Sequence, residues 1–309
     1  LLAKEKVRFA GEPVALVVAE THAQALDAAE LIEVRYAPLP AVTTAEAARA
    51  PGAPVLAAEV PGNVCIDWHT GDAAGAARAF AQAAHVVSLS LDNHRIVMNP
   101  MEPRGGVGMF DPGSGRYTLH VSSQSIHNNR NHVARALGVE AAKVRFVAPD
   151  VGGGFGAKNF AYAEHALLLW AARRTGRPVK WIASRSEVFL SDHAARDMQA
   201  EASLALDAAG KFLALKVASV ANRGAYMAGA GGGVPTFQYV HLQGTVYRLP
   251  AIALHIVAAL TNTAPIGVTR GPGFAETVNI LERLIDAAAH QAGFDRAELI
   301  RVVDADCDR

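Results

Sequence analysis

A glycine-rich segment, Asp150–Lys158, constrains this chain more than any other feature, because four of its nine residues are glycine. A strand-like apolar run at residues 144–147 precedes it, and an apolar run with helical spacing follows it. Without Cβ atoms, such a loop can adopt positive φ and bring backbone amides close to a ligand, and amides at a helix N-terminus favour oxyanions. The segment therefore predicts a strand–loop–helix connection and a phosphate-bearing ligand.

The two common nucleotide-binding motifs do not fit this segment. A Gly-x-Gly-x-x-Ala spacing begins at Gly152, but the dinucleotide motif also needs an acidic residue about 20 positions later, where this chain has Arg173 and Arg174. A Walker loop ends with Lys and then Ser or Thr, whereas this loop ends with Lys158 and Asn159. On its own, the segment is equally compatible with a turn that only packs a helix against a sheet.

Composition excludes several functional classes. The 309 residues are 51% hydrophobic, which is enough for one large or two modest domains. The 29 basic and 29 acidic side chains balance, so we expect no nucleic-acid partner and no anionic membrane partner. No apolar run approaches the roughly 20 residues of a membrane helix, and no signal peptide is visible, so the cytoplasm is the predicted compartment.

Cysteine usage and the chain ends give two further expectations. Cys65 and Cys307 are the only thiols and lie far apart, so neither a disulfide framework nor a thiolate metal site is indicated. The chain begins without methionine and ends shortly after a strong helical pattern. We therefore expect a fragment of a longer protein.

Hydrophobic periodicity predicts the α+β class, with mixed sheets and packed helices. A Pro-, Ala- and Gly-rich stretch at 45–62 reads as a surface linker, and a domain boundary is expected there. The expected helices cover residues 21–30, 72–84, 125–137, 160–175 and 274–291. The expected strands cover 14–19, 32–36, 85–91, 117–122, 144–147, 179–183, 198–206, 212–220 and 252–260, with a hairpin turn at 207–210.

Several kinds of catalytic site are absent from the sequence pattern. None of the twelve histidines occurs in a metal-binding spacing such as His-Glu-x-x-His. His127 and His132 are five residues apart, which on a helix turns their side chains about 140° from each other. We expect the histidines to be exposed or hydrogen-bonded. Neither a Gly-x-Ser-x-Gly elbow nor Ser-x-x-Lys occurs, so nucleophilic hydrolase chemistry is unsupported.

Two polar residues are candidates for chemistry, each with a structural alternative. Gln124 lies between a predicted strand and helix, where its amide could donate to a bound centre or cap the helix. Arg270 lies in a Gly- and Pro-rich turn before the last helix, where it could stabilise developing negative charge or form a surface ion pair. For Glu102 we expect a structural role.

Six short motifs occur in one order along the chain: Asn99–Arg104, Ser123–Ser125, Asp150–Lys158, Gly176–Trp181, Gly224–Tyr226, and Thr261–Pro265 before Arg270. In this order the chain resembles the xanthine dehydrogenase and aldehyde oxidase family, and more narrowly the molybdopterin-binding large subunits of its bacterial members, a group that includes aerobic carbon monoxide dehydrogenases. Several motifs in register are far more specific than one glycine loop. The resemblance implies an α/β hammerhead end at 1–45, a linker at 46–64 and the first molybdopterin-binding domain at 65–309.

The resemblance also implies a cofactor and site residues. Family members hold molybdenum through molybdopterin, which in bacteria is the cytosine dinucleotide, use water as the oxygen source, and pass electrons to [2Fe-2S] and FAD in partner subunits. By motif match, Gln124 hydrogen-bonds an oxo ligand of molybdenum, and Arg270 steadies substrate and transition-state charge. The cofactor is lined by backbone groups of Gly153, Gly154, Phe155 and Gly156.

Three departures from the family pattern bear on the substrate and cofactor. Asn159 replaces the glutamate of xanthine-oxidising members, so we expect an aldehyde or an aromatic N-heterocycle. The turn after Arg270 has no cysteine to bind copper, which disfavours carbon monoxide oxidation. Val302 stands where a cofactor-binding arginine is expected.

The resemblance places the family's general base, a glutamate, and much of the cofactor pocket in a C-terminal half beyond these residues. The isolated chain is therefore expected to bind cofactor poorly and not to turn over. Two alternatives stay open. One is a nucleotide-binding oxidoreductase domain with an atypical glycine loop, in which Arg185 tolerates a 2′-phosphate. The other is a non-catalytic remnant or interaction module.

Overall fold

The computed structural model describes residues 1–228 and 233–304, without the side chains of residues 235 and 302–304. The chain forms two compact units, and each is assembled from two separate segments. Unit 1 comprises Leu1–Ala41 and Val97–Ala194, and unit 2 comprises Val42–Ile96 and Ala195–Arg309. Both units combine mixed sheets with packed helices, so the predicted α+β class is confirmed.

Unit 1 is built on a four-stranded sheet with the order β6-β5-β4-β7. Strands β4 and β5 form an antiparallel hairpin, β5 and β6 are parallel, and β7 pairs antiparallel with β4. The connections β5-α4-β6 and β6-α5-β7 are therefore the crossovers that the strand–loop–helix pattern predicted. The bounds are β4 Gly105–Asp111, β5 Arg116–Val121, β6 Val144–Val147, β7 Val179–Ile182, α4 Ile126–Leu137 and α5 Ala163–Thr175.

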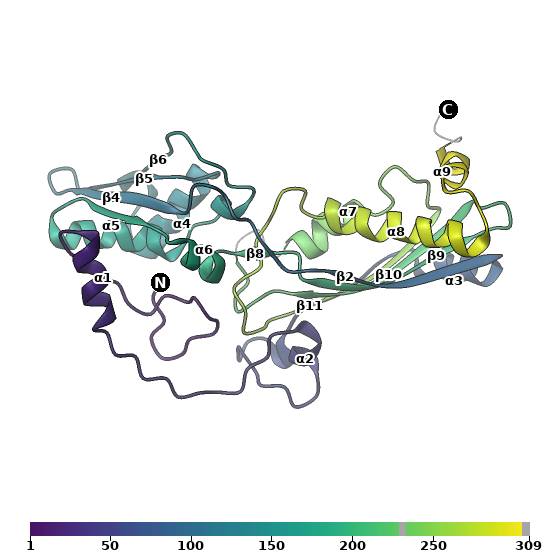
Figure 1. The fold of residues 1–309 in the computed structure, drawn as a ribbon, viewed down its shortest axis with the longest axis horizontal. Coiled ribbons are helices and arrows are strands. Elements are labelled where there is room, and N and C mark those ends of the chain that lie inside the picture. The colour runs from purple at the N-terminus through teal and green to yellow at the C-terminus, as the bar shows by residue number, and fades with distance from the viewer. Residues whose placement is uncertain (229–232, 305–309) are drawn as a thin grey trace. The chain divides into compact units, whose positions relative to one another are not determined.

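Helices α4 and α5 lie against one face of this sheet (Figure 1). Alternate residues of β5, such as Leu119, pack with Val133 of α4 and Leu168 of α5. Both helices end at a glycine with positive φ, Gly138 and Gly176, directly after the predicted helix ends at 137 and 175. The other short elements of this unit are α1 His22–Glu30, η2 Ala141–Lys143, η3 Ala157–Asn159 and α6 Arg185–Ser191.

Unit 2 is built on a five-stranded sheet with the order β1-β11-β10-β9-β2. Strands β9 and β10 form the predicted hairpin, and β10 and β11 are parallel. Both edge strands, β1 and β2, pair antiparallel with their neighbours. The bounds are β1 Val64–Gly71, β2 His85–Asn93, β9 Met198–Leu206, β10 Phe212–Asn222 and β11 Ala251–Ala259.

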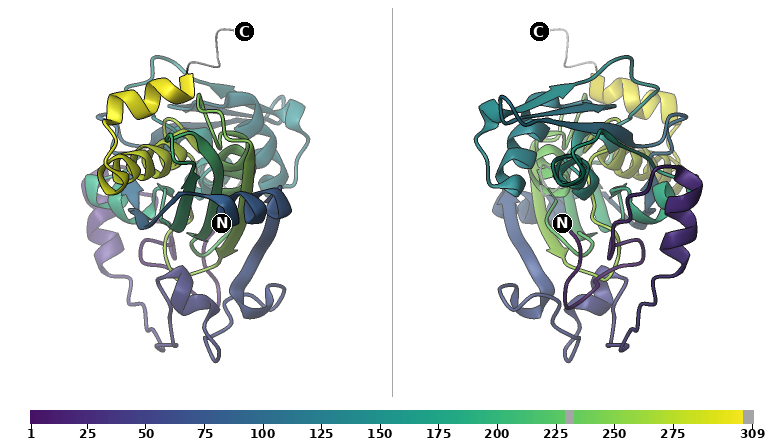
Figure 2. Two further views of the ribbon diagram at one scale, coloured as in Figure 1. Left: turned by 90° about the vertical axis from the view of Figure 1, so that its right-hand side faces the viewer. Right: turned by 90° about the vertical axis from the view of Figure 1, so that its left-hand side faces the viewer.

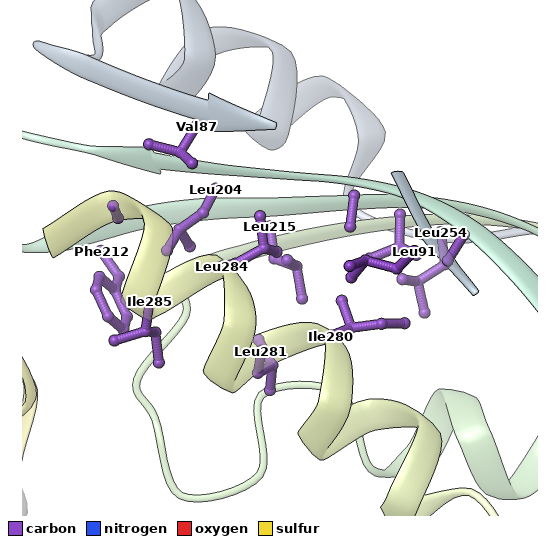
Figure 3. Close-up of a cluster of buried hydrophobic side chains, with 14 of the residues drawn as sticks. Val87, Leu91, Leu204, Phe212, Leu215, Leu254, Ile280, Leu281, Leu284 and Ile285 are labelled. Carbon is purple, nitrogen blue, oxygen red and sulfur yellow. The ribbon is translucent and has the colours of Figure 1, made fainter. Parts of the chain in front are cut away.

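The two faces of this sheet are covered differently. Helix α8, Phe274–Ala292, covers one face, while α3, Ala73–Gln82, and α2, Ala45–Arg49, pack against the other (Figures 1 and 2). Between α8 and the sheet lies the larger core, in which residues of four strands meet one helical stripe (Figure 3). The labelled members are Val87, Leu91, Leu204, Phe212, Leu215, Leu254, Ile280, Leu281, Leu284 and Ile285.

The remaining elements are short or lie at the edges of the units. They are η1 Pro61–Asn63, β3 Ile96–Val97, β8 Ala194–Ala195, η5 Val234–Gln238, α7 Tyr239–His241 and α9 Arg296–Asp304. Among the described residues, no helix combines the length and hydropathy needed to cross a bilayer.

Two predicted strands are wrong, and four observed strands were not predicted. Residues 14–19 and 32–36 form no strand in the described structure, because they pair with no neighbouring strand. Strands β1 and β4 and the two-residue strands β3 and β8 were not predicted. The stretch predicted as a linker contains α2 and η1.

A candidate cofactor-binding loop

The glycine loop connects β6 to η3 and is fitted closely to two neighbouring side chains. A Cβ atom on Gly154 would lie 2.4 Å from Oε1 of Gln124, and one on Gly152 would lie 2.5 Å from Cβ of Glu102. Both distances are too short for any other residue without a shift of the neighbour. The glycines therefore allow two side chains from separate segments to reach this backbone.

Phe155 interrupts the glycines with an unusual conformation. Its φ is +51°, in the left-handed region that bulky residues rarely adopt, and 42% of the residue is exposed. Such a backbone costs about 1–3 kcal/mol and is found mostly at ligand-binding and active sites. An exposed aromatic residue on a strained loop marks this segment as a candidate site.

Gln124 is joined to the loop through its side-chain oxygen. Oε1 accepts hydrogen bonds from the backbone amides of Gly156, at 2.9 Å, and Lys158, at 3.3 Å. The Gln124 amide donates to the Lys158 carbonyl at 2.9 Å. Because Oε1 is held by two donors, the Nε2 group is left to donate elsewhere, and it donates to no residue that the structure describes. The helix-capping alternative is not observed, since the N-cap of α4 is Ser125.

The loop amides differ from the expected oxyanion site in one respect. Helix α5 begins at Ala163, after the intervening turn η3, so the glycines do not form its N-terminus. The amides of Gly156 and Lys158 point to Gln124. Within the described residues, the amides of Gly153 and Gly154 donate no hydrogen bond, which leaves this pair for a ligand.

Glu102 and Lys158 anchor the start and end of the loop. One carboxylate oxygen of Glu102 accepts from Ser122 Oγ at 2.6 Å, from the Gly152 amide at 2.8 Å and from Lys158 Nζ at 2.6 Å. Desolvation acts to raise the pKa of Glu102, but the bonds from Lys158, Ser122 and Gly152 outweigh it and lower that pKa. The Lys158 side chain is fully buried. These contacts are the structural role expected of Glu102.

Arg185 is committed to a structural contact. Its guanidinium donates to the Asn99 side chain, to the Pro100 carbonyl at 2.8 Å and to the Met101 carbonyl at 3.0 Å. The sequence alternative in which Arg185 accommodates a 2′-phosphate requires this group to be available. The structure therefore disfavours that alternative.

A buried polar cluster supports the segment on the other side of Glu102. Arg104 donates to Asp192 at 2.5 Å and to Glu164 at 3.1 Å, and its guanidinium stacks 3.8 Å from the Tyr162 ring centroid. Burial lowers the pKa of neighbouring His165 to about 4, so this imidazole is neutral near neutral pH. Through Arg104, the cluster joins the segment Asn99–Arg104 to the first turn of α5 and to Asp192.

The predicted roles of Asn159 and Val302 are not tested by the described residues. Asn159 is half-buried in η3, and its backbone amide donates to the Gly156 carbonyl at 3.1 Å. Its place in a substrate pocket stays a prediction. The side chain of Val302 and the whole of Cys307 lie outside the described residues.

Arg270 belongs to unit 2, in the turn before α8, and is exposed. A residue that sequence reasoning missed, Arg196, holds this turn. Arg196 donates to the Arg270 carbonyl at 2.9 Å, to the Gly271 carbonyl at 3.3 Å and to the buried Glu276 carboxylate at 2.7 Å. No local pattern marks Arg196, because its partners lie more than 70 residues later.

Comparison with protein families gives two matches along the chain. Residues 56–302 match the family described as the molybdopterin cofactor-binding domain. Residues 1–40 match the aldehyde oxidase and xanthine dehydrogenase a/b hammerhead domain. Together they cover most of the sequence.

Individual proteins show the same similarity. The carbon monoxide dehydrogenase large chain of Hydrogenophaga pseudoflava is 35% identical over 97% of this chain and 39% of its own length. The 6-hydroxypseudooxynicotine dehydrogenase complex subunit gamma of Paenarthrobacter nicotinovorans is also 35% identical, over 97% of this chain and 37% of its own length. The crystal structure of quinoline 2-oxidoreductase from Pseudomonas putida 86 superposes with a TM-score of 0.90 and 36% identity, over 97% of this chain and 38% of that one. This chain thus spans less than half the length of these relatives.

Proposed function

The chain belongs to the molybdopterin-binding proteins of the aldehyde oxidase and xanthine dehydrogenase family, and from this premise we propose that it is part of a molybdenum hydroxylase. The reaction proposed is oxidation of an aldehyde or an aromatic N-heterocycle, with water as the source of oxygen. The observation that carries the proposal is the arrangement of Gln124 over the glycine loop, which matches what a cofactor cradle requires.

The loop residues fit a large polar cofactor. Gly154 lets the backbone approach closely, the amides of Gly153 and Gly154 are left to donate, and Gln124 is held so that its Nε2 group is also a donor. Two donors on the loop and one on the segment before α4 suit a ligand that is rich in acceptors. We propose that Gly153, Gly154, Phe155 and Gly156 hold molybdopterin, as the cytosine dinucleotide, and that Gln124 donates to it. When bound, this cofactor supplies the redox chemistry.

We assign Arg270 an electrostatic role toward the substrate. Its guanidinium cation can stabilise negative charge that develops on a substrate oxygen or ring nitrogen. Arg196 acts as a positioning residue, because it bonds the Arg270 carbonyl and restrains the backbone that carries the guanidinium. Arg270 is thereby presented on a fixed turn.

Substrate class is proposed from two positions. Asn159 offers a neutral amide, which cannot engage a purine as a carboxylate does, so the site is better suited to aldehydes or other N-heterocycles. The segment Gly271–Glu276, at the turn before α8 and the start of that helix, has no cysteine to hold copper, which argues against carbon monoxide as the substrate. The names of the quinoline and nicotine-derivative enzymes among the relatives support a heterocycle.

Further components are proposed from the family and the covered length. We propose iron–sulfur and FAD partner subunits, to which the electrons pass, and a cytoplasmic location. The names of relatives, as large chains or complex subunits, support only the existence of partner subunits. We propose that a C-terminal half supplies the glutamate base, so that the isolated chain does not turn over. Within this chain, we propose residues 1–45 as the hammerhead end, 46–64 as the linker and 65–309 as the first molybdopterin-binding domain.

The test is to express the chain alone and together with a candidate C-terminal half and the partner subunits. Molybdenum content is measured by mass spectrometry, and turnover with an artificial electron acceptor against aldehydes and N-heterocycles. The complex is expected to contain molybdenum and to turn over, while the chain alone is expected to bind little molybdenum and not to turn over. Stoichiometric molybdenum and turnover by the chain alone would overturn the assignment of the base to a second half.

The site residues are tested in the same complex. Gln124→Ala and Arg270→Ala are each expected to reduce kcat/KM by about a hundredfold while molybdenum content changes little, because each group donates to charge that grows during the reaction. Gln291→Ala and Arg145→Ala are matched controls on exposed residues and should leave both readouts unchanged. Parallel losses of metal and turnover would show that Gln124 and Arg270 only maintain the fold.

A further inference from the structure

Three potential metal ligands gather on the exposed surface of the five-stranded sheet in unit 2. Asp67 and His69 lie two residues apart on β1, so both side chains point to the same face. His255 lies on β11, directly opposite His69 in the antiparallel register. The cluster is thus fixed by strand pairing and includes no residue of the glycine loop or of the Arg270 turn.

The distances within this cluster are short. His255 Nε2 lies 2.8 Å from a carboxylate oxygen of Asp67, and the rings of His69 and His255 stack with centroids 3.8 Å apart and an interplanar angle of 9°. One ligand atom from each residue can be chosen so that all three lie within 4.8 Å of one another. Ligands of a tetrahedral zinc ion lie roughly 3.4 Å apart, given bonds of about 2.0–2.1 Å. The side chains of Asp67 and His255 are 61% and 38% exposed, so small rotations can close the difference.

The chemistry of the set selects the class of ion. Two imidazole nitrogens and one carboxylate oxygen are typical ligands of zinc and of neighbouring transition metals, whereas magnesium and calcium take oxygen ligands almost alone. Three protein ligands leave a coordination position for water. Paired strands hold the ligand backbones rigidly, which favours binding over ligands carried by a mobile loop.

We propose that Asp67, His69 and His255 form a binding site for one divalent cation of the zinc class. The two strands bring together residues separated by almost 190 positions, which is why no spacing in the sequence indicates the site. The simpler alternative is that the contact is only a hydrogen-bonded Asp–His pair beside a stacked ring. The alternatives differ in whether both histidines contribute to metal affinity.

The test is titration of the full chain with Zn²⁺ by isothermal calorimetry, after treatment with a chelator. We expect one equivalent to bind, and Co²⁺ in its place to give a visible absorption band of a low-coordinate site with nitrogen ligands. His69→Gln and His255→Gln are each expected to weaken Zn²⁺ binding by at least about tenfold, and Asp67→Asn to weaken it as well. His290→Gln, an exposed histidine on α8, is the matched control and should bind as the parent does.

Circular dichroism shows whether each variant remains folded. The two histidines are on different strands, so if one histidine variant fails to fold, the other histidine variant still tests the proposal. Asp67→Asn provides a third variant. Nitrogen hyperfine lines in the electron paramagnetic resonance spectrum of bound Cu²⁺ give an independent count of imidazole ligands in the unmodified chain. Parent-like Zn²⁺ affinity in the folded His69→Gln or His255→Gln variant, or an equal loss in His290→Gln, would overturn the proposal.

Discussion

The structure defines well how much the free energy of unfolding should fall when the Glu102 carboxylate is removed. Lys158 is fully buried, and its ammonium group lies 2.6 Å from Glu102, which also accepts from Ser122 and Gly152. In Glu102→Ala the lysine stays in place without its acceptor. Breaking a fully buried ion pair in this way costs about 3–5 kcal/mol.

Solvent access to Glu102 reduces this expected cost. The Glu102 side chain is 40% exposed, so water can enter and partly replace the carboxylate. We therefore expect Glu102→Ala to lower the free energy of unfolding by about 2–3 kcal/mol. Glu102→Gln keeps an acceptor oxygen and should lose about half as much. The exposed Glu140→Ala control should change stability by less than about 0.5 kcal/mol.

Urea unfolding followed by tryptophan fluorescence measures these differences. Trp170 and Trp181 lie in unit 1, so a Trp68→Phe background confines the signal to that unit. In a Lys158→Met background the buried charge is gone, and Glu102→Ala should then cost about 1 kcal/mol or less. An equal loss with and without Lys158 would refute the argument that the buried ammonium carries the penalty.

The pH dependence gives an independent readout of the same contact. The pKa of Glu102 is lowered in the folded state, so the carboxylate contributes its full stabilisation above the pKa of the unfolded state, about 4.3. This stabilisation is lost as the pH falls through the lower pKa of the folded state. The difference in stability between the parent and Glu102→Gln should therefore shrink below about pH 4. A difference that stays constant to lower pH would contradict this linkage.

Two further predictions concern the same unit. In Gly154→Ala the new Cβ would lie 2.4 Å from Gln124 Oε1, so the glutamine must leave the loop amides, and unfolding in urea should show a loss of about 1–2 kcal/mol that Gly113→Ala, in an open turn, does not share. If Gly154→Ala costs the same in a Gln124→Ala background, the contact is not the cause. The pKa of buried His165 is lowered to about 4, so stability should fall as the pH drops from about 6.5 toward 4, by up to about 1.4 kcal/mol per pH unit. Thermal unfolding of His165→Gln should lack this slope, the exposed His127→Gln should retain it, and an unchanged slope in His165→Gln would rule His165 out as its source.

Elements governed by local interactions were predictable from the sequence. The capping box of Thr21 and Gln24 is present at α1, and the Asp207 turn joins β9 to β10. In α8, Leu281, Leu284, Ile285 and Ala288 form a buried stripe with helical spacing, whereas Val278, which shares that spacing, is 43% exposed. Each of these features depends on residues that are close in the sequence.

Elements that depend on distant partners were not predictable. Strand β4 has three glycines and a weak strand pattern, yet it pairs on both sides, and Gly108 lies close against the Leu168 backbone of α5. Residues 14–19 and 32–36 are the opposite case. Their side-chain pattern is typical of a strand, but no described strand pairs with them. A single pattern reports side-chain preference, whereas a strand exists only when its backbone is paired.

The candidate site divides in the same way. Motif order pointed to Gln124 and the glycine loop, and the structure joins them through the Gly156 and Lys158 amides. The residues that hold the loop and the Arg270 turn, Glu102 and Arg196, act across more than 50 positions each. Their roles arise from tertiary contacts that no short spacing encodes.

Each unit is assembled from two separate segments of the chain, which has a consequence for biosynthesis. Strand β2 is synthesised before its partner β9, which begins only after the second segment of unit 1 has been made. At about 5–20 residues per second, β2 waits on the order of 5–20 s with unpaired backbone groups and the apolar side chains of Val87 and Leu91 uncovered. Nascent chains stalled within that interval should be the species that recruit chaperones and aggregate most readily.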